Sequence, residues 1–208
     1  MTNFIKRIIS TIILLPLVFY LIINGSYYLI IFLIICFLIS CYEWHKMIKN
    51  QYYKIFGFIF LALSFYVFHQ LSNEIWTVLF VISICVLTDI GGYLFGKLIG
   101  GPKLTKISPN KTYAGAIGGY FLSFILLTII INFVDYPFLN VQFFITFILI
   151  STVSQIGDII ISYFKRKSKI KNTGKIIPGH GGLLDRIDGM IFAFPIYYLI
   201  DLIGYLNI

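Results

Sequence analysis

The stretch of this chain that is richest in chemically versatile residues runs from Pro178 to Gly189 and reads PGHGGLLDRIDG. Its glycines allow backbone N–H groups to face an anion, as they do in phosphate-binding nests. Asp185 and Asp188 are three residues apart, so their carboxylates share a face if the segment is helical. Proteins use carboxylates beside cations to handle a metal–polyphosphate complex. The segment therefore predicts a site of that kind.

Two basic loops accompany this segment. Seven Lys and Arg residues fall between residues 165 and 188. The earlier loop GGPKLTKISPNKTYAGAIGG contains Ser108, Lys111 and Thr112 ahead of an expected helix N-terminus, which also favours anions. The chain has no G-x-x-x-x-G-K-S/T motif and no zinc-binding cluster, which excludes a P-loop nucleotide site and a zinc site. Attraction to anionic lipid is the alternative explanation of the basic charges.

These loops belong to a chain that is otherwise apolar. Of its 208 residues, 59% are hydrophobic and 12% are charged, and the mean hydropathy is +0.94. We therefore expect an all-α polytopic membrane protein with about seven transmembrane helices, since each apolar run could cross a hydrocarbon core of about 30 Å. The expected spans are roughly 8–23, 27–44, 55–71, 75–96, 112–134, 141–164 and 189–207.

The positive charges are distributed asymmetrically between the breaks. All 16 Lys and Arg residues lie in the N-terminus or in alternate breaks, and the remaining breaks have none. Since cytoplasmic loops are enriched in Lys and Arg, we expect a cytoplasmic N-terminus and a site on the cytoplasmic side of the inner membrane. One integral membrane domain is expected, with N-terminal helices over residues 1–74 and a catalytic core with the basic loops over residues 75–208.

Two of the apolar runs contain polar faces with carboxylates. A charged side chain at the bilayer centre costs at least about 2.5–3.5 kcal/mol, so it needs a specific reason. Neither run contains Lys or Arg, and we therefore expect a bound cation or a water-filled cavity to balance Asp89 and Asp158. Hydrogen bonding between helices is the alternative, and it is favoured for the serines and Gln155. The faces comprise Ser151, Ser154, Gln155, Asp158 and Ser162 in one run and Cys85, Asp89, Gly92 and Gly96 in the other.

Together these motifs resemble the phosphatidate cytidylyltransferases, also called CDP-diacylglycerol synthases. The stretch SYFKRKSKIKNTGKIIPGHGGLLDRIDG matches the family signature at a dozen positions. SQIGDIIIS and DIGGYLFGK with SPNKTYAGAIGG also match, so the resemblance covers roughly residues 85–190. Tyr113 stands where the family usually has Trp, Ala114 where it commonly has Glu, and Asn172 where it has Asp. Those two missing acids can have no role in this chain.

The resemblance implies a reaction of CTP with phosphatidate that gives CDP-diacylglycerol and pyrophosphate for phospholipid biosynthesis. It implies a divalent metal cofactor, Mg²⁺, held by Asp158 and Asp185, with Asp188 assisting as the third catalytic carboxylate. CTP- and phosphate-binding roles are implied for Ser108, Lys111, Thr112, Lys165, Arg166, Lys171, Gly179, His180, Gly181, Gly182 and Arg186. Asp89, Ser154, Gln155 and Ser162 are expected to complete a polar core.

The expected partners are CTP, phosphatidate and membrane lipid, with no nucleic acid, and the small helix faces would allow a homodimer. Two other function classes stay open. A CTP-dependent polyprenol or lipid kinase would use a similar membrane core but would transfer the γ-phosphoryl group. A membrane transporter would account for the intramembrane carboxylates, but it would not account for the basic, glycine-rich motif.

The charge asymmetry gives a topology that thiol labelling can test. We predict that Ser72→Cys reacts with an impermeant thiol reagent in intact cells and that Ser168→Cys reacts only after the membrane is opened. The reason is that the loop of Ser168 is rich in Lys and Arg and the loop of Ser72 has none. The unsubstituted chain, whose three Cys lie in apolar runs, is the control. Labelling of both positions from outside would contradict the topology.

Overall fold

The computed structural model describes residues 16–23, 25–133, 141–177, 179 and 181–203. In these residues the chain is mostly helical, and its extended pairings are two isolated bridges, Lys103 with Thr112 and Ile177 with Gly181. The all-α prediction is thereby confirmed for the described part of the chain. The chain forms two compact units, which we call unit one (Met1–Thr77 with Phe164–Asp188) and unit two (Val78–Tyr163 with Gly189–Ile208).

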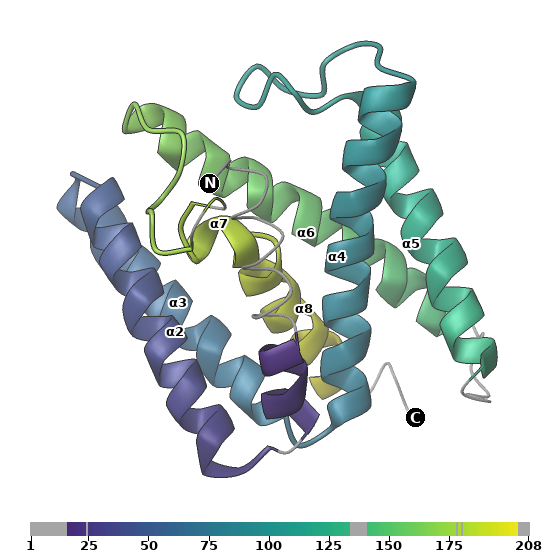
Figure 1. The fold of residues 1–208 in the computed structure, drawn as a ribbon, viewed down its shortest axis with the longest axis horizontal. Coiled ribbons are helices and arrows are strands. Elements are labelled where there is room, and N and C mark those ends of the chain that lie inside the picture. Colours follow the sequence, from purple (N-terminus) through teal and green to yellow (C-terminus); the bar gives the residue numbers. More distant parts are fainter. Residues whose placement is uncertain (1–15, 24, 134–140, 178, 180, 204–208) are drawn as a thin grey trace. The chain divides into compact units, whose positions relative to one another are not determined.

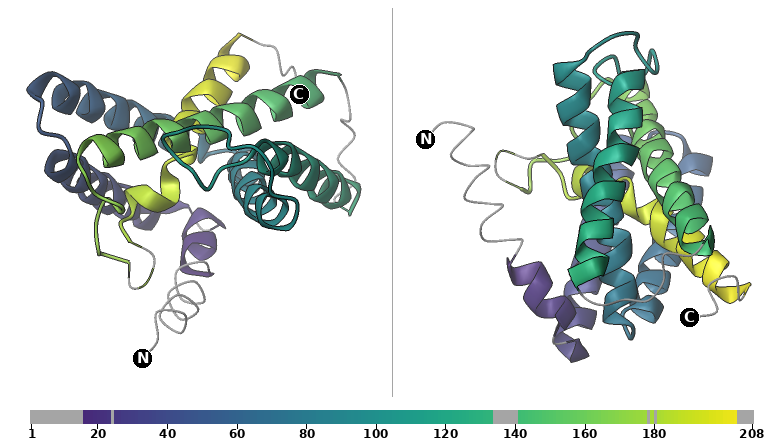
Figure 2. Two further views of the ribbon diagram at one scale, coloured as in Figure 1. Left: turned by 90° about the horizontal axis from the view of Figure 1, so that it is seen from above. Right: turned by 90° about the vertical axis from the view of Figure 1, so that its right-hand side faces the viewer.

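Unit one contains the helices α2 (Ser26–Met47) and α3 (Gln51–Leu71), which run side by side in Figures 1 and 2. The break between them is set by Asn50, whose side-chain oxygen accepts hydrogen bonds from the N–H groups of Tyr52 and Tyr53. A side chain that satisfies the first N–H groups favours the start of a helix. For this reason α3 begins at Gln51, ahead of the apolar run that starts near residue 55.

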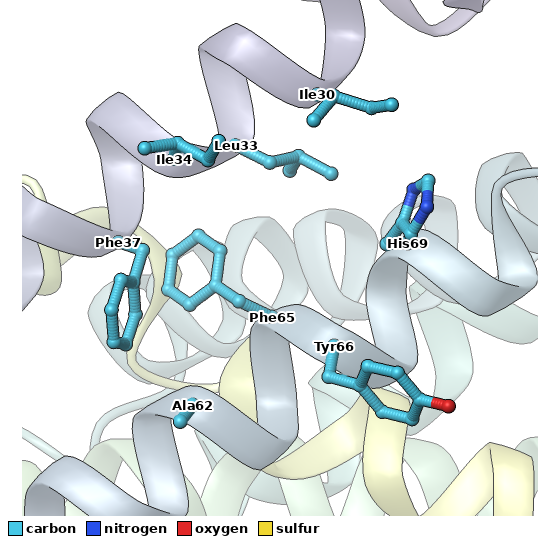
Figure 3. A pocket seen from close by; sticks show the side chains of 8 residues that line it. All are labelled: Ile30, Leu33, Ile34, Phe37, Ala62, Phe65, Tyr66 and His69. Carbon is cyan, nitrogen blue, oxygen red and sulfur yellow. The ribbon is translucent and has the colours of Figure 1, made fainter.

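An apolar groove of about 240 Å³ lies between these two helices (Figure 3). Its lining comes from the first half of α2 and the second half of α3, and it offers few of the polar groups that a phosphate requires. The lining residues are Ile30, Leu33, Ile34, Phe37, Ala62, Phe65, Tyr66 and His69. The polar contacts between α2 and the motif-bearing loop are found towards the other end of α2.

At that end, α2 packs against the segment that follows the last turns of α6 (Val141–Lys167). The indole N–H of Trp44 donates to the carbonyl of Tyr53 at 3.2 Å, and the indole ring packs edge-on against Phe164 at 5.0 Å. The hydroxyl of Ser168 donates to the carbonyl of Met47 at 2.6 Å. These contacts fix the start of the motif-bearing loop to the end of α2.

Unit two contains α4 (Ile75–Leu98), α5 (Tyr113–Phe133), most of α6 and α8 (Met190–Leu202), and Figure 2 shows α4 and α5 side by side. Their backbones approach closely along glycines. A Cβ atom on Gly91 would lie 2.6 Å from the carbonyl oxygen of Gly118, and one on Gly115 would lie 2.6 Å from that of Gly92. Gly92 and Gly96 of the face that contains Asp89 also lie towards α5, since Cβ atoms there would be 3.8 Å from the oxygen of Gly115 and 3.3 Å from the hydroxyl oxygen of Thr112.

Buried hydroxyl groups connect three helices of unit two. Thr88 on α4 donates a hydrogen bond to Ser123 on α5 at 3.4 Å, and its Oγ1 lies 2.9 Å from the Oγ of Ser151 on α6. All three side chains are buried. For Ser151 the interpretation as a hydrogen bond between helices is therefore confirmed.

Four described helices are long and apolar enough to cross a membrane: Tyr27–Met47, Gln51–Leu71, Ile75–Leu98 and Val141–Lys167. The apolar segments Tyr113–Ile129 and Met190–Leu202 are shorter, and residues 16–23 are helical. The rest of the first expected span and the last residues of the seventh lie outside the described residues. A multi-span membrane protein is supported. The count of seven, the orientation of the N-terminus and the division at residues 74 and 75 stay predictions.

The glycine contact between α4 and α5 predicts different costs for two adjacent substitutions. Gly91→Ala should lower the free energy of unfolding by about 1–3 kcal/mol, because the new methyl group meets backbone atoms that cannot move aside. Gly92→Ala is the matched control, since the nearest atom to its Cβ would be 3.8 Å away. Equilibrium unfolding in mixed detergent micelles, followed by circular dichroism, measures both. An equal loss in the two variants would contradict the observed packing.

Candidate active site

The loop between α6 and α7 (Leu184–Ile187) contains the glycine-rich motif. Near its end the backbone N–H of Ile177 donates to the carbonyl of Gly181 at 3.0 Å, which closes a tight turn. Gly179 and Gly181 have φ angles of +77° and +95°, in the left-handed region that favours glycine. These two glycines of the motif therefore have a backbone conformation that is typical of turns. His180, to which a CTP-binding role was assigned, lies outside the described residues.

Asp185 is the centre of the hydrogen bonding in unit one. Its Oδ1 accepts from the ammonium of Lys165 at 2.8 Å. Its Oδ2 accepts from the backbone N–H groups of Thr173 at 2.8 Å and of Gly182 at 3.0 Å. The Lys165 ammonium also lies 3.9 Å from Oδ2 of Asp188. The structure thus brings together three predicted site residues, Lys165, Asp185 and Asp188.

The predicted phosphate-binding cations of unit one differ in exposure. Lys165 is buried, and its ammonium neutralises buried carboxylates. Arg166, Lys171 and Arg186 are exposed. An exposed cation can meet a phosphate without leaving a buried carboxylate unpaired, so these three residues suit that role better than Lys165 does.

Sequence reasoning missed Glu43, which lies in the expected span 27–44. Its side chain is buried, and its carboxylate accepts hydrogen bonds from the N–H groups of Leu183 at 3.0 Å and Leu184 at 2.9 Å. It also accepts from the hydroxyl of Thr173 at 2.8 Å. A signal was present in the sequence, because a carboxylate inside an otherwise apolar run needs a specific reason.

In unit two, the loop between α4 and α5 folds back on itself ahead of α5. The N–H of Leu104 donates to the carbonyl of Lys111 at 2.8 Å, and the N–H of Lys111 donates to the carbonyl of Ser108 at 3.0 Å. Thr112 caps α5, because its hydroxyl oxygen accepts from the N–H of Gly115 at 3.0 Å. The predicted phosphate-binding residues of this loop are thereby held in a defined turn at the start of a helix.

This loop supplies the partner of Asp158. The ammonium of Lys111 lies 2.5 Å from Oδ2 of Asp158, and the hydroxyl of Ser162 donates to Oδ1 at 3.2 Å. Lys111 is therefore a protein cation beside Asp158 that the expectation of a bound cation or a water-filled cavity did not include. The expectation considered only basic residues in the same apolar runs, whereas the partner comes from the neighbouring loop.

Two polar atoms one turn before Asp158 have no such partner. The Oγ of Ser154 and the Nε2 of Gln155 are buried without a hydrogen-bond partner in the described part of the chain. The expected hydrogen bonds between helices are therefore not seen for these two atoms, although buried polar atoms are normally paired. Asp89, by contrast, is exposed on α4 and lies outside the buried hydroxyl cluster formed by Thr88, Ser123 and Ser151.

The acidic residues allow a test of the expected magnesium ion. Among the described residues, no three His, Cys, Asp or Glu side chains gather as a preformed metal site. Mg²⁺ commonly binds through one or two carboxylates plus waters and substrate phosphates, so such a cage is not required. Asp158 and Asp185 each pair with a lysine ammonium, so a metal would bind either carboxylate in exchange for that contact. The donor chemistry fits a metal that arrives with a polyphosphate.

Comparisons with known proteins agree on one family. A model of the cytidylyltransferase family matches residues 5–72 and 51–203. The chain is 37% identical over 215 residues to a phosphatidate cytidylyltransferase of Rickettsia bellii (strain RML369-C), covering 96% of this chain and 91% of the relative. Proteins of the same name from Staphylococcus aureus (strain COL) and Staphylococcus haemolyticus (strain JCSC1435) are 42% and 38% identical over 66% of this chain. The chain spans about half the length of these staphylococcal relatives, 54% in each case.

The buried position of Lys165 predicts a stability effect that an exposed cation would not have. Lys165→Met should lower the free energy of unfolding by about 3–5 kcal/mol, because it leaves two buried carboxylates without their ammonium. Arg166→Met is the matched control on the next residue. Arg166 is exposed, so its loss should change stability by about 0.5 kcal/mol or less. Detergent unfolding curves that coincide for the two variants would refute the buried network.

Proposed function

Because the chain belongs to the cytidylyltransferase family, we propose that it transfers the cytidylyl group of CTP to phosphatidate and forms CDP-diacylglycerol and pyrophosphate. The observation that carries this proposal is the match to the Rickettsia bellii relative, which is named for that activity and aligns with 96% of this chain. The site supports it, because exposed cations and a pair of turn-forming glycines accompany the buried carboxylates of residues 166–188, in and around α7. The product would enter phospholipid biosynthesis.

In this reaction, an oxygen of the phosphatidate phosphate attacks the α-phosphorus of CTP. A P–O bond forms between the lipid phosphate and the α-phosphorus, and the bond from the α-phosphorus to the oxygen that bridges to the β-phosphorus breaks. Pyrophosphate leaves in line with the attack. A phosphate monoester is already nucleophilic near neutral pH, so the step depends on positioning and on neutralised charge.

The exposed cations Arg166, Lys171 and Arg186 are the proposed contacts of the triphosphate in unit one. In unit two, Lys111 is the proposed cation, because its ammonium is held by the partly exposed Asp158 and can exchange partners. The N–H groups of the turn at Gly179 and Gly181 add uncharged donors of the kind that bind phosphate oxygens. Lys165 is assigned to the support of Asp185.

We propose that Asp158 and Asp185 hold Mg²⁺ and that Asp188 assists. When bound, the metal would neutralise charge on the phosphate oxygens of CTP. The pairing of each aspartate with a lysine supports the proposal, because these contacts orient both carboxylates. The two aspartates belong to different units, so the shared metal rests on the family resemblance and on their chemistry.

We also propose that the chain crosses the inner membrane about seven times, with its N-terminus and active site on the cytoplasmic side. The support is the restriction of all 16 Lys and Arg residues to the N-terminus and alternate breaks. The homodimer stays a prediction from the sequence alone, because the small residues of α4 pack against α5 of the same chain.

An assay of products tests the function directly. Membranes that contain the chain are incubated with phosphatidate, Mg²⁺ and CTP labelled on its α-phosphate, and the lipid fraction is extracted. A cytidylyltransferase transfers the label to lipid, whereas a CTP-dependent lipid kinase transfers only the γ-phosphate. A transporter transfers neither the α-phosphate nor the γ-phosphate of CTP to lipid. Absence of lipid-bound α-label would refute the proposal.

The metal assignment predicts the behaviour of conservative aspartate variants. Asp158→Asn and Asp185→Asn should each abolish turnover, because the amide keeps the size of the side chain but lacks the charge that holds Mg²⁺. The double variant should lose nothing further, since either change removes the same site. Asp201→Asn, on an exposed residue of α8, is the matched control and should keep full activity. Mg²⁺-dependent activity in either single variant would exclude the shared metal.

A further inference from the structure

The buried carboxylate of Glu43 has no part in the proposed reaction, and its environment is unusual. The side chain is 1% exposed, although the residue belongs to an apolar helix. Its hydrogen-bond donors are three neutral groups, namely the backbone N–H groups of Leu183 and Leu184 and the hydroxyl of Thr173. A buried carboxylate is costly unless donors satisfy it, so this arrangement needs an explanation.

The hydrogen-bond geometry requires both oxygens of the Glu43 side chain to act as acceptors. Oε1 accepts from Leu183, and Oε2 accepts from both Leu184 and Thr173. An ionised carboxylate is an acceptor only, so it matches three converging donors. An amide would turn its NH₂ group towards one of the two backbone N–H groups, whichever way it was oriented. Both backbone contacts can therefore form only with a carboxylate.

The loop is shaped to receive this side chain. A methyl group on Gly174 would overlap the Glu43 carboxylate, and a methyl group on Gly182 would overlap both that carboxylate and the Thr173 hydroxyl. Glycine at these two positions thus permits the loop to lie directly against Glu43. The carboxylate contacts both sides of the loop, at residue 173 and at residues 182–184.

The same two sides of the loop hold Asp185. Thr173 donates its hydroxyl to Glu43 and its backbone N–H to Asp185. Gly182 donates its N–H to Asp185, and the next residue, Leu183, donates to Glu43. The two carboxylates therefore share adjacent donors, and a displacement of the backbone at one of them displaces the donors of the other.

From these contacts we propose that Glu43 is a positioning residue, which fixes the backbone donors that orient Asp185. The inference rests on the proposed function, in which Asp185 acts on CTP. It gives the N-terminal helices a part in the active site, because Glu43 comes from α2 whereas the loop lies 130 to 141 residues later in the chain. Glu43 acts through Thr173 and the loop backbone, and it does not contact the substrate.

Hydrogen exchange tests the contact without any need for activity. Glu43→Gln should raise the exchange rates of the Leu183 and Leu184 amides by about tenfold or more in the full-length chain, because one of these N–H groups loses its acceptor. Glu74→Gln makes the same chemical change at an exposed residue and is the matched control. Exchange that is unchanged in Glu43→Gln would overturn the inference, whatever the reaction proves to be.

Kinetics then separate positioning from folding. Per folded molecule, Glu43→Gln should lower kcat/KM for CTP by about 10- to 100-fold and leave KM for phosphatidate unchanged. Thr173→Val should give a smaller loss, and Thr173→Ser, which keeps the hydroxyl, should restore activity. The Glu43→Gln and Thr173→Val changes together should cost little more than Glu43→Gln alone, since they act on one network.

Two outcomes would overturn the positioning role. One is a Glu43→Gln chain that folds less well but has normal kcat/KM per folded molecule, which would make the role structural only. The other is full additivity of the Glu43 and Thr173 variants. If the unsubstituted chain puts no α-label in lipid, the proposed function fails instead, and hydrogen exchange still decides whether Glu43 holds the loop.

Discussion

A buried carboxylate must be paired with cations or with hydrogen-bond donors, and this requirement governs the polar part of the structure. Asp185 is met by one ammonium and two backbone N–H groups. Glu43 is met by three neutral donors, and Asp158 by an ammonium and a hydroxyl. The two basic loops contribute Lys111 and the backbone and hydroxyl donors around Thr173 and Gly182, and α6 contributes Lys165 and Ser162.

The same requirement changes how the basic residues should be interpreted. Sixteen Lys and Arg residues in a short apolar chain suggest a surface for phosphate or for lipid headgroups. Lys165 and Lys111 each form an ion pair with an aspartate of the same unit, in addition to any contact with phosphate. The cations available to a triphosphate are therefore fewer than the composition suggests, and the exposed Arg166, Lys171 and Arg186 are the better candidates in unit one.

The helices could be predicted because their signal is local. Apolar runs and the polar breaks between them gave the positions of α2 to α6 to within a few residues, and the largest shift at a start, in α3, follows from the cap at Asn50. The motif around Asp185 was also local, so its resemblance to a known family could be recognised in one short stretch of residues. The partners of Asp158 and Glu43 could not be predicted from the sequence. No periodicity connects residues on separate segments, and several donors of the right type were available for each carboxylate.

The wide separation in sequence between Glu43 and its donors has a consequence for the assembly of the protein in the membrane. Thr173, Leu183 and Leu184 are synthesised 130, 140 and 141 residues after Glu43. Until they emerge from the ribosome, α2 has a carboxylate without these partners, and this makes the end of that helix costly to bury.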